Sequence, residues 1–222
     1  MIIETPGYVI RSLNSNEVYW EPDVYPAWTP LRTFRPFPNQ RRGNGVEPHY
    51  HDGDELWLFT SGRGEVWLDD RAFPITPNTA VYTPMGTVHR FQMFTDFDNV
   101  AMVTPLERQM RPAHLTREEH GPPVPTVPGF VVPGERNHGP FPDRGKRCPL
   151  SELRLVDLAA GAAVEDARLS TNEHWAAVAG SLHLVLESLD VELVAGDVAL
   201  LRAGTRRRLY SERGARAALA RE

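Results

Sequence analysis

Residues 43–62 read GNGVEPHYHDGDELWLFTSG, and this stretch decides the fold. His49 and His51 are two residues apart, so in a β-strand both imidazoles lie on one face. Glu55 follows after a step that includes Gly53, which permits a turn or bulge and returns the carboxylate to that face. Asp52 and Asp54 are expected to be turn and solvent residues rather than ligands.

A second stretch, Thr83–His89 (TPMGTVH), supplies a third imidazole. A tight turn there is expected to start a new strand with His89 at its head. Three imidazoles and one carboxylate suit a divalent transition metal such as Fe, Mn, Co, Ni or Zn. We therefore predict one such ion per chain, held by His49, His51, Glu55 and His89.

Short apolar runs separated by turn residues surround these motifs, with no helical periodicity between them. Strand signals at such close spacing indicate an all-β sandwich or barrel. The N-terminal region adds short runs at Tyr8–Ile10, Val18–Trp20 and Leu31–Phe34. The regular strands are expected at Glu55–Thr60, Glu65–Asp69, Ala80–Thr83, His89–Phe94 and Asn99–Thr104.

The two histidine motifs resemble those of the cupin superfamily. The first cupin motif matches at every spacing, and the second departs from the pattern where Asn78 replaces a glycine and Met93 an asparagine. Neither departure is at a metal ligand. The resemblance implies a jelly-roll β-barrel, and it implies a homodimer because cupins frequently pair through sheet edges. The first motif matches at Gly43, His49, His51, Glu55 and Gly62, and the second at Pro84, Gly86 and His89.

An internal repeat extends the pattern to the second half of the chain. Residues 55–62 align with 173–180, and residues 78–87 align with 196–205. This half looks like a degenerate cupin, since only Glu173 keeps its place among the ligand positions. A lone carboxylate is a poor transition-metal site. Strands are expected at Leu153–Leu158, Trp175–Ala179, Leu182–Leu186, Val191–Val194, Val198–Leu201 and Arg208–Tyr210, and the lost histidines are replaced by Ala167, Leu169 and Arg207.

Half of the 20 prolines lie in residues 105–150. A segment with so many prolines cannot form a central strand of a sheet. We therefore expect two cupin-type β-barrels joined by a long proline-rich connector, either a lid or a linker. The expected division is an N-terminal metal-binding cupin domain at 1–108, the connector at 109–149 and a degenerate C-terminal cupin domain at 150–222.

Several residues are candidates for a pocket around the metal. Period-2 alternation sends Trp57 and Phe59 inward with Glu55, and Phe91 and Met93 inward with His89. An inward arginine would imply an anionic substrate, because guanidinium binds carboxylate or phosphate bidentately. The catalytic and pocket candidates are Glu47, Tyr50, Trp57, Tyr82, Phe91 and Arg35, whereas Arg41, Arg42 and Arg206–Arg208 are expected to be exposed.

Composition excludes several classes of protein. A net charge of −5 argues against nucleic acid as a partner, and the single cysteine excludes an internal disulfide and a thiolate zinc cluster. No apolar run approaches a membrane span, and the N-terminus lacks the features of a signal peptide, so a cytoplasmic location is expected.

The favoured function is a metal-dependent enzyme acting on a small polar metabolite, most readily an Fe(II) dioxygenase. One alternative is a metal-dependent isomerase or epimerase of a sugar or sugar phosphate, which needs a base beside the metal, with Glu47, Tyr50 or Tyr82 as nominees. Another is a non-catalytic ligand-binding cupin, because fold alone does not choose among these functions.

Overall fold

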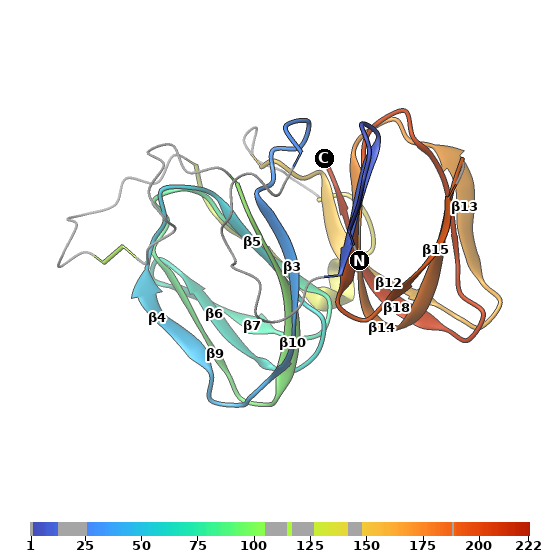
Figure 1. Ribbon diagram of the computed structural model, residues 1–222. Helices are drawn as coiled ribbons and strands as arrows, with labels where there is room; N and C mark the ends of the chain where they lie inside the picture. The colour runs from blue at the N-terminus through green and yellow to red at the C-terminus, as the bar shows by residue number, and fades with distance from the viewer. Residues whose placement is uncertain (1, 13–25, 105–114, 117–126, 142–147, 188) are drawn as a thin grey trace.

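The computed structural model describes residues 2–12, 26–104, 115–116, 127–141, 148–187 and 189–222. These residues form two β-barrels side by side, and Figure 1 shows the N-terminal barrel in blue to green and the C-terminal barrel in orange to red. The one helical element among them is a 3₁₀ turn, η2 (Gly134–Arg136). The expected all-β fold with two barrels is confirmed.

The N-terminal barrel consists of two antiparallel sheets that face each other. The first sheet has the order β11-β8-β5-β10-β3, and the second has the order β4-β9-β6-β7. The strands are β3 (Thr33–Gln40), β4 (Gly45–His49), β5 (Glu55–Phe59), β6 (Gly64–Leu68), β7 (Arg71–Ile75), β8 (Thr79–Thr83), β9 (His89–Met93), β10 (Phe97–Val103) and β11 (Phe130–Val132).

The C-terminal barrel is built around one long strand, β14. Its first part pairs with β16 and β18, and its second part pairs with β15 and β17. One continuous strand therefore contributes to both walls of the barrel. Its strands are β12 (Glu152–Leu158), β13 (Ala163–Arg168), β14 (Glu173–Leu186), β15 (Leu189–Val194), β16 (Asp197–Leu201), β17 (Arg206–Tyr210) and β18 (Ala215–Arg221).

The N-terminal end of the chain joins the C-terminal barrel. Strand β1 (Ile2–Glu4) pairs with β2 (Tyr8–Ser12), and β2 pairs with β16. The expected domain at 1–108 assigned these residues to the N-terminal barrel, so the structure corrects that assignment for residues 2–12. Pairing across such a sequence separation leaves no local signal in the sequence.

Three apolar cores hold the molecule together. One fills the N-terminal barrel around Trp57 and Phe59, and another fills the C-terminal barrel around Trp175 and Leu184. The third lies between the barrels and combines side chains of both, among them Leu58 and Ala218. Strands β5 and β14 therefore bury both faces, which explains the unbroken burial of β5 and of residues 173–177.

The described part of the expected connector packs on the N-terminal barrel. Strand β11 extends the first sheet by pairing with β8, and Leu115 forms a bridge with Tyr50. Asn137 binds the backbone carbonyl of Asn78 through its amide (2.8 Å). Residues 109–114, 117–126 and 142–147 of the expected connector lie outside the described residues, as does the expected strand at Val18–Trp20.

The aligned glycines of the two halves share an unusual backbone conformation. Gly62 and Gly180 both have positive φ (+88° and +69°), and so do Gly86 and Gly204 (+79° and +90°). Asn78, which replaces a motif glycine, has φ +70°. Asparagine tolerates this left-handed region better than most residues, so the departure from the motif keeps the turn.

Candidate metal centre

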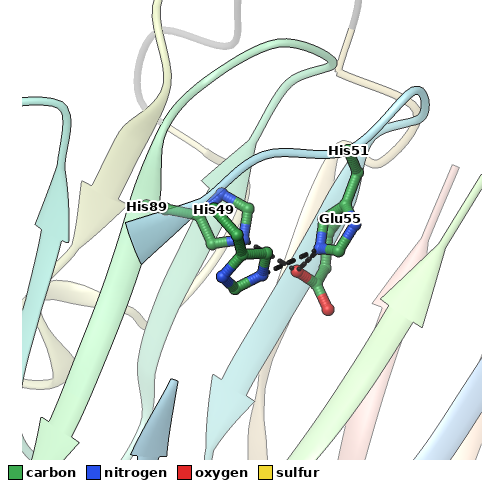
Figure 2. A group of neighbouring side chains, drawn as sticks. All are labelled: His49, His51, Glu55 and His89. Carbon is green, nitrogen blue, oxygen red and sulfur yellow. Dashed lines mark hydrogen bonds and ion pairs between the residues drawn. The ribbon is translucent and has the colours of Figure 1, made fainter. Parts of the chain in front are cut away.

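The four predicted ligands converge at one end of the N-terminal barrel. His49 ends β4, Glu55 begins β5, and His89 begins β9, while His51 lies in the connection between β4 and β5. Figure 2 shows the three imidazoles and the carboxylate pointing toward one another. All four residues are buried, and their ligand atoms lie within 4.8 Å of one another.

A bulge in β4 brings His49 into line with His89. Val46 pairs with Phe91 and His49 pairs with His89, so β4 has one more residue than β9 between these two pairs. Such a bulge re-aims side chains at the end of a strand. Without the bulge, Val46 and His49 would lie on opposite faces of β4, because they are three residues apart; the bulge brings both to the face that lines the barrel.

The spacing of the ligand atoms matches a metal coordination sphere. His49 Nε2 lies 3.2 Å from His51 Nε2, and Glu55 Oε2 lies 3.2 Å from His51 Nε2 and 3.3 Å from His89 Nε2. Atoms held about 2.1 Å from one ion at tetrahedral or octahedral angles are about 3.0–3.4 Å apart. His89 Nε2 and Glu55 Oε2 are buried without a hydrogen-bond partner among the described residues, so the donor set fits a metal ion.

Backbone carbonyls orient two of the imidazoles. His49 Nδ1 donates to the carbonyl of Glu47 (2.6 Å), and His89 Nδ1 donates to that of Thr87 (2.8 Å). A carbonyl only accepts, so in each neutral ring Nδ1 carries the proton and Nε2 presents its lone pair to the centre. This is the usual orientation of metal-binding histidines.

Glu55 is ionised at the centre of the cluster. Burial raises the pKa of its carboxyl, but the hydrogen bonds and positive charge of His51 and His89, when these rings carry a proton on Nε2, outweigh burial and hold the pKa well below its ordinary value of 4.5. The carboxylate therefore offers a negative charge to a cation over the whole physiological pH range.

Asp54 fixes the turn that leads to His89. Its Oδ1 accepts from the backbone N–H of Met85 (2.8 Å), and its Oδ2 accepts from the Tyr82 hydroxyl (3.0 Å). The N–H of Gly86 donates to the carbonyl of His51 (3.0 Å), which ties the same turn to the first motif. The sequence predicted a turn at Asp54 but not its role in positioning His89. The available sign of that role was its position next to the ligand Glu55.

Two of the pocket candidates lie beside the cluster. Trp57 is buried, and its ring centre is 5.2 Å from that of His89 and 5.3 Å from that of Phe91. Both rings belong to the interior core or pack against it, together with Phe59 and Met93. The expected inward alternation of these residues is confirmed, and the aromatic rings form an apolar wall next to the ligands.

The three nominated bases do not face the barrel interior. Glu47 is exposed, and its backbone carbonyl, rather than its carboxylate, contacts His49. Tyr50 falls between the two histidines in the alternation and bridges to Leu115. Tyr82 packs in the core between the barrels, and its hydroxyl binds Asp54.

Arg35 is half-buried on β3, with its guanidinium carbon 5.1 Å from the centre of the Phe37 ring. Arg41 and Arg42 are exposed, as expected.

A cavity of about 440 Å³ borders two of the four ligands, His49 and His89. Its other lining residues include several that alternate with these ligands along the strands, so the cavity lies at the strand ends that carry the cluster. It is lined by Pro48, His49, Tyr50, Trp67, Asp69, Asp70, Val88, His89 and Arg90.

A buried ion pair occupies the corresponding place in the C-terminal barrel. Ala167 pairs with Arg207 after a bulge in β13, as His49 pairs with His89 after the bulge in β4. The Arg207 guanidinium binds both carboxylate oxygens of Glu173, with Nη2–Oε1 at 3.0 Å and Nε–Oε2 at 3.2 Å. Arg207 is only 4% exposed, so the expectation that it is exposed was wrong. Its alignment with His89 was the signal for an inward position.

Comparisons with known proteins agree with this picture. Residues 40–104 match the sequence model of a family described as "Cupin domain". Residues in an 85-residue stretch are 32% identical to "Uncharacterized protein y4oW" of Sinorhizobium fredii (strain NBRC 101917 / NGR234), a match that covers 38% of this chain and 39% of that protein.

Solved structures share the fold across the chain. AerE from Microcystis aeruginosa aligns with a TM-score of 0.59 at 11% identity, over 100% of this chain and 96% of that chain. A Bacillus subtilis oxalate decarboxylase with Mn(II) centres aligns at 0.61 and 15%, over 100% and 75%. Salicylate 1,2-dioxygenase from Pseudaminobacter salicylatoxidans aligns at 0.51 and 11%, over 82% and 68%. At these identities the likeness shows the fold alone.

No helix in the described part of the chain has the length and apolar character needed to cross a bilayer.

Proposed function

We propose that this chain is a metal-dependent enzyme that binds one divalent transition metal at His49, His51, Glu55 and His89 and acts on a small polar metabolite. The observation that carries the proposal is the buried cluster of four ligand atoms at coordination spacing. The site is at the end of a barrel, where a metal with four protein ligands keeps positions open for a substrate.

The favoured reaction is an Fe(II)-dependent dioxygenation. Fe(II) held by the four ligands would bind and activate dioxygen, and the substrate would supply the electrons that reduce it. The chain's own residues prepare the site: the Glu47 and Thr87 carbonyls fix two imidazoles, and Trp57 and Phe91 exclude water beside them. An apolar wall beside a polar centre is typical of small-molecule sites and limits side reactions.

The isomerase or epimerase alternative is less favoured for a geometric reason. Such a reaction needs a general base within hydrogen-bond reach of the substrate carbon's proton. Glu47 is exposed, and the Tyr82 hydroxyl is bound to Asp54 in the core between the barrels. A dioxygenase does not require such a base, so the arrangement of these side chains supports it over the isomerase.

The first experiment is elemental analysis of protein purified anaerobically without chelator or added metal. Iron near one per chain, with substrate-dependent oxygen uptake in a screen of catechols, thiols and keto acids, is the expected result. Zinc, nickel or manganese at that ratio, with turnover of sugars under anaerobic conditions, would favour the isomerase instead. Protein purified without any bound metal would favour the non-catalytic, ligand-binding alternative.

The ligand assignment has its own test. His51→Ala is expected to abolish stoichiometric metal binding while the far-UV circular dichroism spectrum stays that of an all-β protein. Full metal content in this variant would refute the assignment of His51. A homodimer remains a prediction, which sedimentation equilibrium of the wild-type protein would test.

A further inference from the structure

The register of β6 and β9 places Trp67 and Arg90 on the outer surface of the N-terminal barrel. The two residues pair with each other, and Leu68, which follows Trp67, belongs to the interior core. Since side chains alternate along a strand, Trp67 and Arg90 project to the opposite side. The next outward position after Trp67 is Asp69, whose backbone N–H donates to the carbonyl of Val88 (2.7 Å). These side chains point away from the metal cluster, whose ligand atoms converge inside the barrel (Figure 2).

The outward side chains line the cavity of about 440 Å³. Val88 lies between Asp69 on one side and Tyr50 on the other, because His49 pairs with His89 and Tyr50 therefore follows opposite Val88. Aromatic and aliphatic groups thus form much of the lining, and a few charged groups converge on it. This composition and this volume are typical of a small-molecule site.

Arg90 is held on the face of the Trp67 indole. Its guanidinium carbon lies 4.2 Å from the centre of the Trp67 ring. A guanidinium that stacks on an aromatic face keeps its N–H donors in its own plane, where they can bind both oxygens of a carboxylate. Arg90 is exposed and forms no ion pair with any described residue. The cavity therefore contains a positioned group that can bind an anion.

Asp69 brings the opposite charge to the same cavity. It lies two residues along β6 from the partner of Arg90, and such diagonal cross-strand neighbours have Cα atoms about 7–8 Å apart. Because the guanidinium is held on Trp67, it does not reach Asp69, and Asp69 has no ion pair within the described part of the chain. One negative and one positive group therefore face the cavity close together without neutralising each other.

We propose that this cavity binds a small zwitterion, an α-amino acid, at a site separate from the metal cluster. The Arg90 guanidinium binds the α-carboxylate, the Asp69 carboxylate binds the α-ammonium, and the ligand's side chain lies against Val88 and Tyr50. A ligand with both charges on one carbon satisfies two groups that are so close together, whereas a simple anion or cation satisfies only one of them. The site uses no metal, so the inference goes beyond the proposed function and does not depend on it.

The test is calorimetric titration of the protein with L-leucine, N-acetyl-L-leucine and L-leucinamide at neutral pH and millimolar concentrations. The two derivatives lack the ammonium and the carboxylate charge respectively. Leucine is expected to bind, and each derivative is expected to bind at least about tenfold more weakly because it loses one charge-assisted contact. Equal binding of the three compounds, or no binding of either leucine or phenylalanine, would overturn the proposal.

Variants assign each charge of the ligand to its partner. Arg90→Gln is expected to weaken leucine binding about tenfold or more and to leave leucinamide binding unchanged. Asp69→Asn is expected to weaken leucine binding and to leave N-acetyl-leucine binding unchanged. Asparagine suits this position because Asp69 has φ +51°.

The matched control is Arg71→Gln, which removes an exposed guanidinium that stacks on Phe73 (5.0 Å) outside the cavity. It is expected to bind all three compounds as the wild type does. An equal loss of all three compounds in Arg90→Gln or Asp69→Asn would show a structural effect instead of charge recognition, and it would contradict the proposal.

Metal-free protein separates this site from the cluster, because an α-amino acid can also chelate a metal through its nitrogen and one oxygen. Leucine affinity is expected to be the same before and after the metal is removed by a chelator, and the same in His51→Ala. Leucine binding that disappears with the metal would place the ligand at the cluster and overturn the proposal. Charge-selective binding by a protein that never takes up metal would refute the proposed function alone.

Discussion

At the scale of single residues, both barrels bury a glutamate carboxylate but surround it with different partners. In the N-terminal barrel, a buried carboxylate, Glu55, faces three imidazoles at a site that fits a metal. In the C-terminal barrel, Glu173 is 1% exposed and is neutralised by Arg207. A buried carboxylate needs a cation in either case, and a guanidinium supplies it permanently.

Arg207→Leu is therefore expected to destabilise the protein by about 3–5 kcal/mol, because it leaves Glu173 as a buried charge with too little compensation. Urea unfolding followed by tryptophan fluorescence measures this. The matched control is Arg206→Leu, which removes an exposed pair with Asp166 and is expected to leave the free energy of unfolding close to that of the wild type. Similar losses in the two variants would contradict the assigned role of Arg207.

Asp54→Ala is expected to weaken metal binding about 10- to 100-fold, as the loss of groups that orient metal ligands generally does. The physical reason is that the turn carrying Met85 and Gly86 loses its side-chain anchor ahead of His89. Competition with a metal chelator gives the affinity. Asp70→Ala, at an exposed turn residue, is expected to retain the wild-type value, and an unchanged affinity in Asp54→Ala would remove Asp54 from the site.

At the scale of the elements, alternation and turn residues predicted most strands of the N-terminal barrel. The expected strand Glu55–Thr60 is β5 (Glu55–Phe59), and Asn99–Thr104 overlaps β10 (Phe97–Val103). Strands β13 and β18 were missed because alanine, arginine and acidic residues, which have low β-propensity, dominate them. Their pairing with neighbouring strands, rather than their composition, makes them strands.

The sequence also split β14 in two, at Trp175–Ala179 and Leu182–Leu186, because Gly180 reads as a turn. In the structure Gly180 has φ +69° and continues the strand from one wall of the barrel to the other. A Cβ added there would lie 2.3 Å from the carbonyl oxygen of Gly214. Gly180 is thus a bend within one strand.

Gly180→Ala is expected to cost at least about 1–3 kcal/mol from the left-handed backbone alone, with the contact to Gly214 adding to it. Thermal unfolding by calorimetry measures the loss. Gly161→Ala is the control, since Gly161 also has positive φ (+77°) but has nothing within 4 Å of an added Cβ. A loss no larger than that of the control would show that the close approach to Gly214 does not matter.

The candidate site was predictable as far as short-range spacing determines it. Ligand spacing identified the four residues that the structure brings together, and alternation identified Trp57 and Phe91. In a regular strand Glu47 would share a face with His49, which is why it was nominated as a base. The bulge between Val46 and His49 breaks this alternation, and Glu47 is exposed. The direction of Tyr82 depends on the second barrel, whose packing against β8 was not visible in the sequence.

At the scale of the whole molecule, Glu222 ties together segments that are distant in the sequence. Its carboxylate accepts from His174 Nε2 (2.7 Å), Asn172 Nδ2 (2.6 Å) and the Thr29 hydroxyl. Burial raises the pKa of Glu222, but the hydrogen bonds from His174, Thr29 and Asn172 outweigh burial and lower it. The ionised form therefore stabilises the fold.

Because its pKa is lower in the folded chain than its ordinary value of 4.5, Glu222 contributes stability above about pH 4.5 that is lost as pH falls through the folded-state value. Glu222→Gln is expected to be less stable than wild type at pH 7 and to lose less stability between pH 5 and 3. Unfolding midpoints across this pH range test it. The exposed control Glu187→Gln is expected to follow the wild-type curve.

The pairing of β2 with β16 has a consequence for how the protein is made. Strand β2 leaves the ribosome long before its partner β16 (Asp197–Leu201), because more than 180 residues separate the two in the chain. At bacterial or eukaryotic elongation rates the wait is on the order of ten seconds or more. Throughout that time neither face of β2, with Val9 on one and Ile10 on the other, has a core to pack against. The second barrel can therefore close only after β16 has been translated.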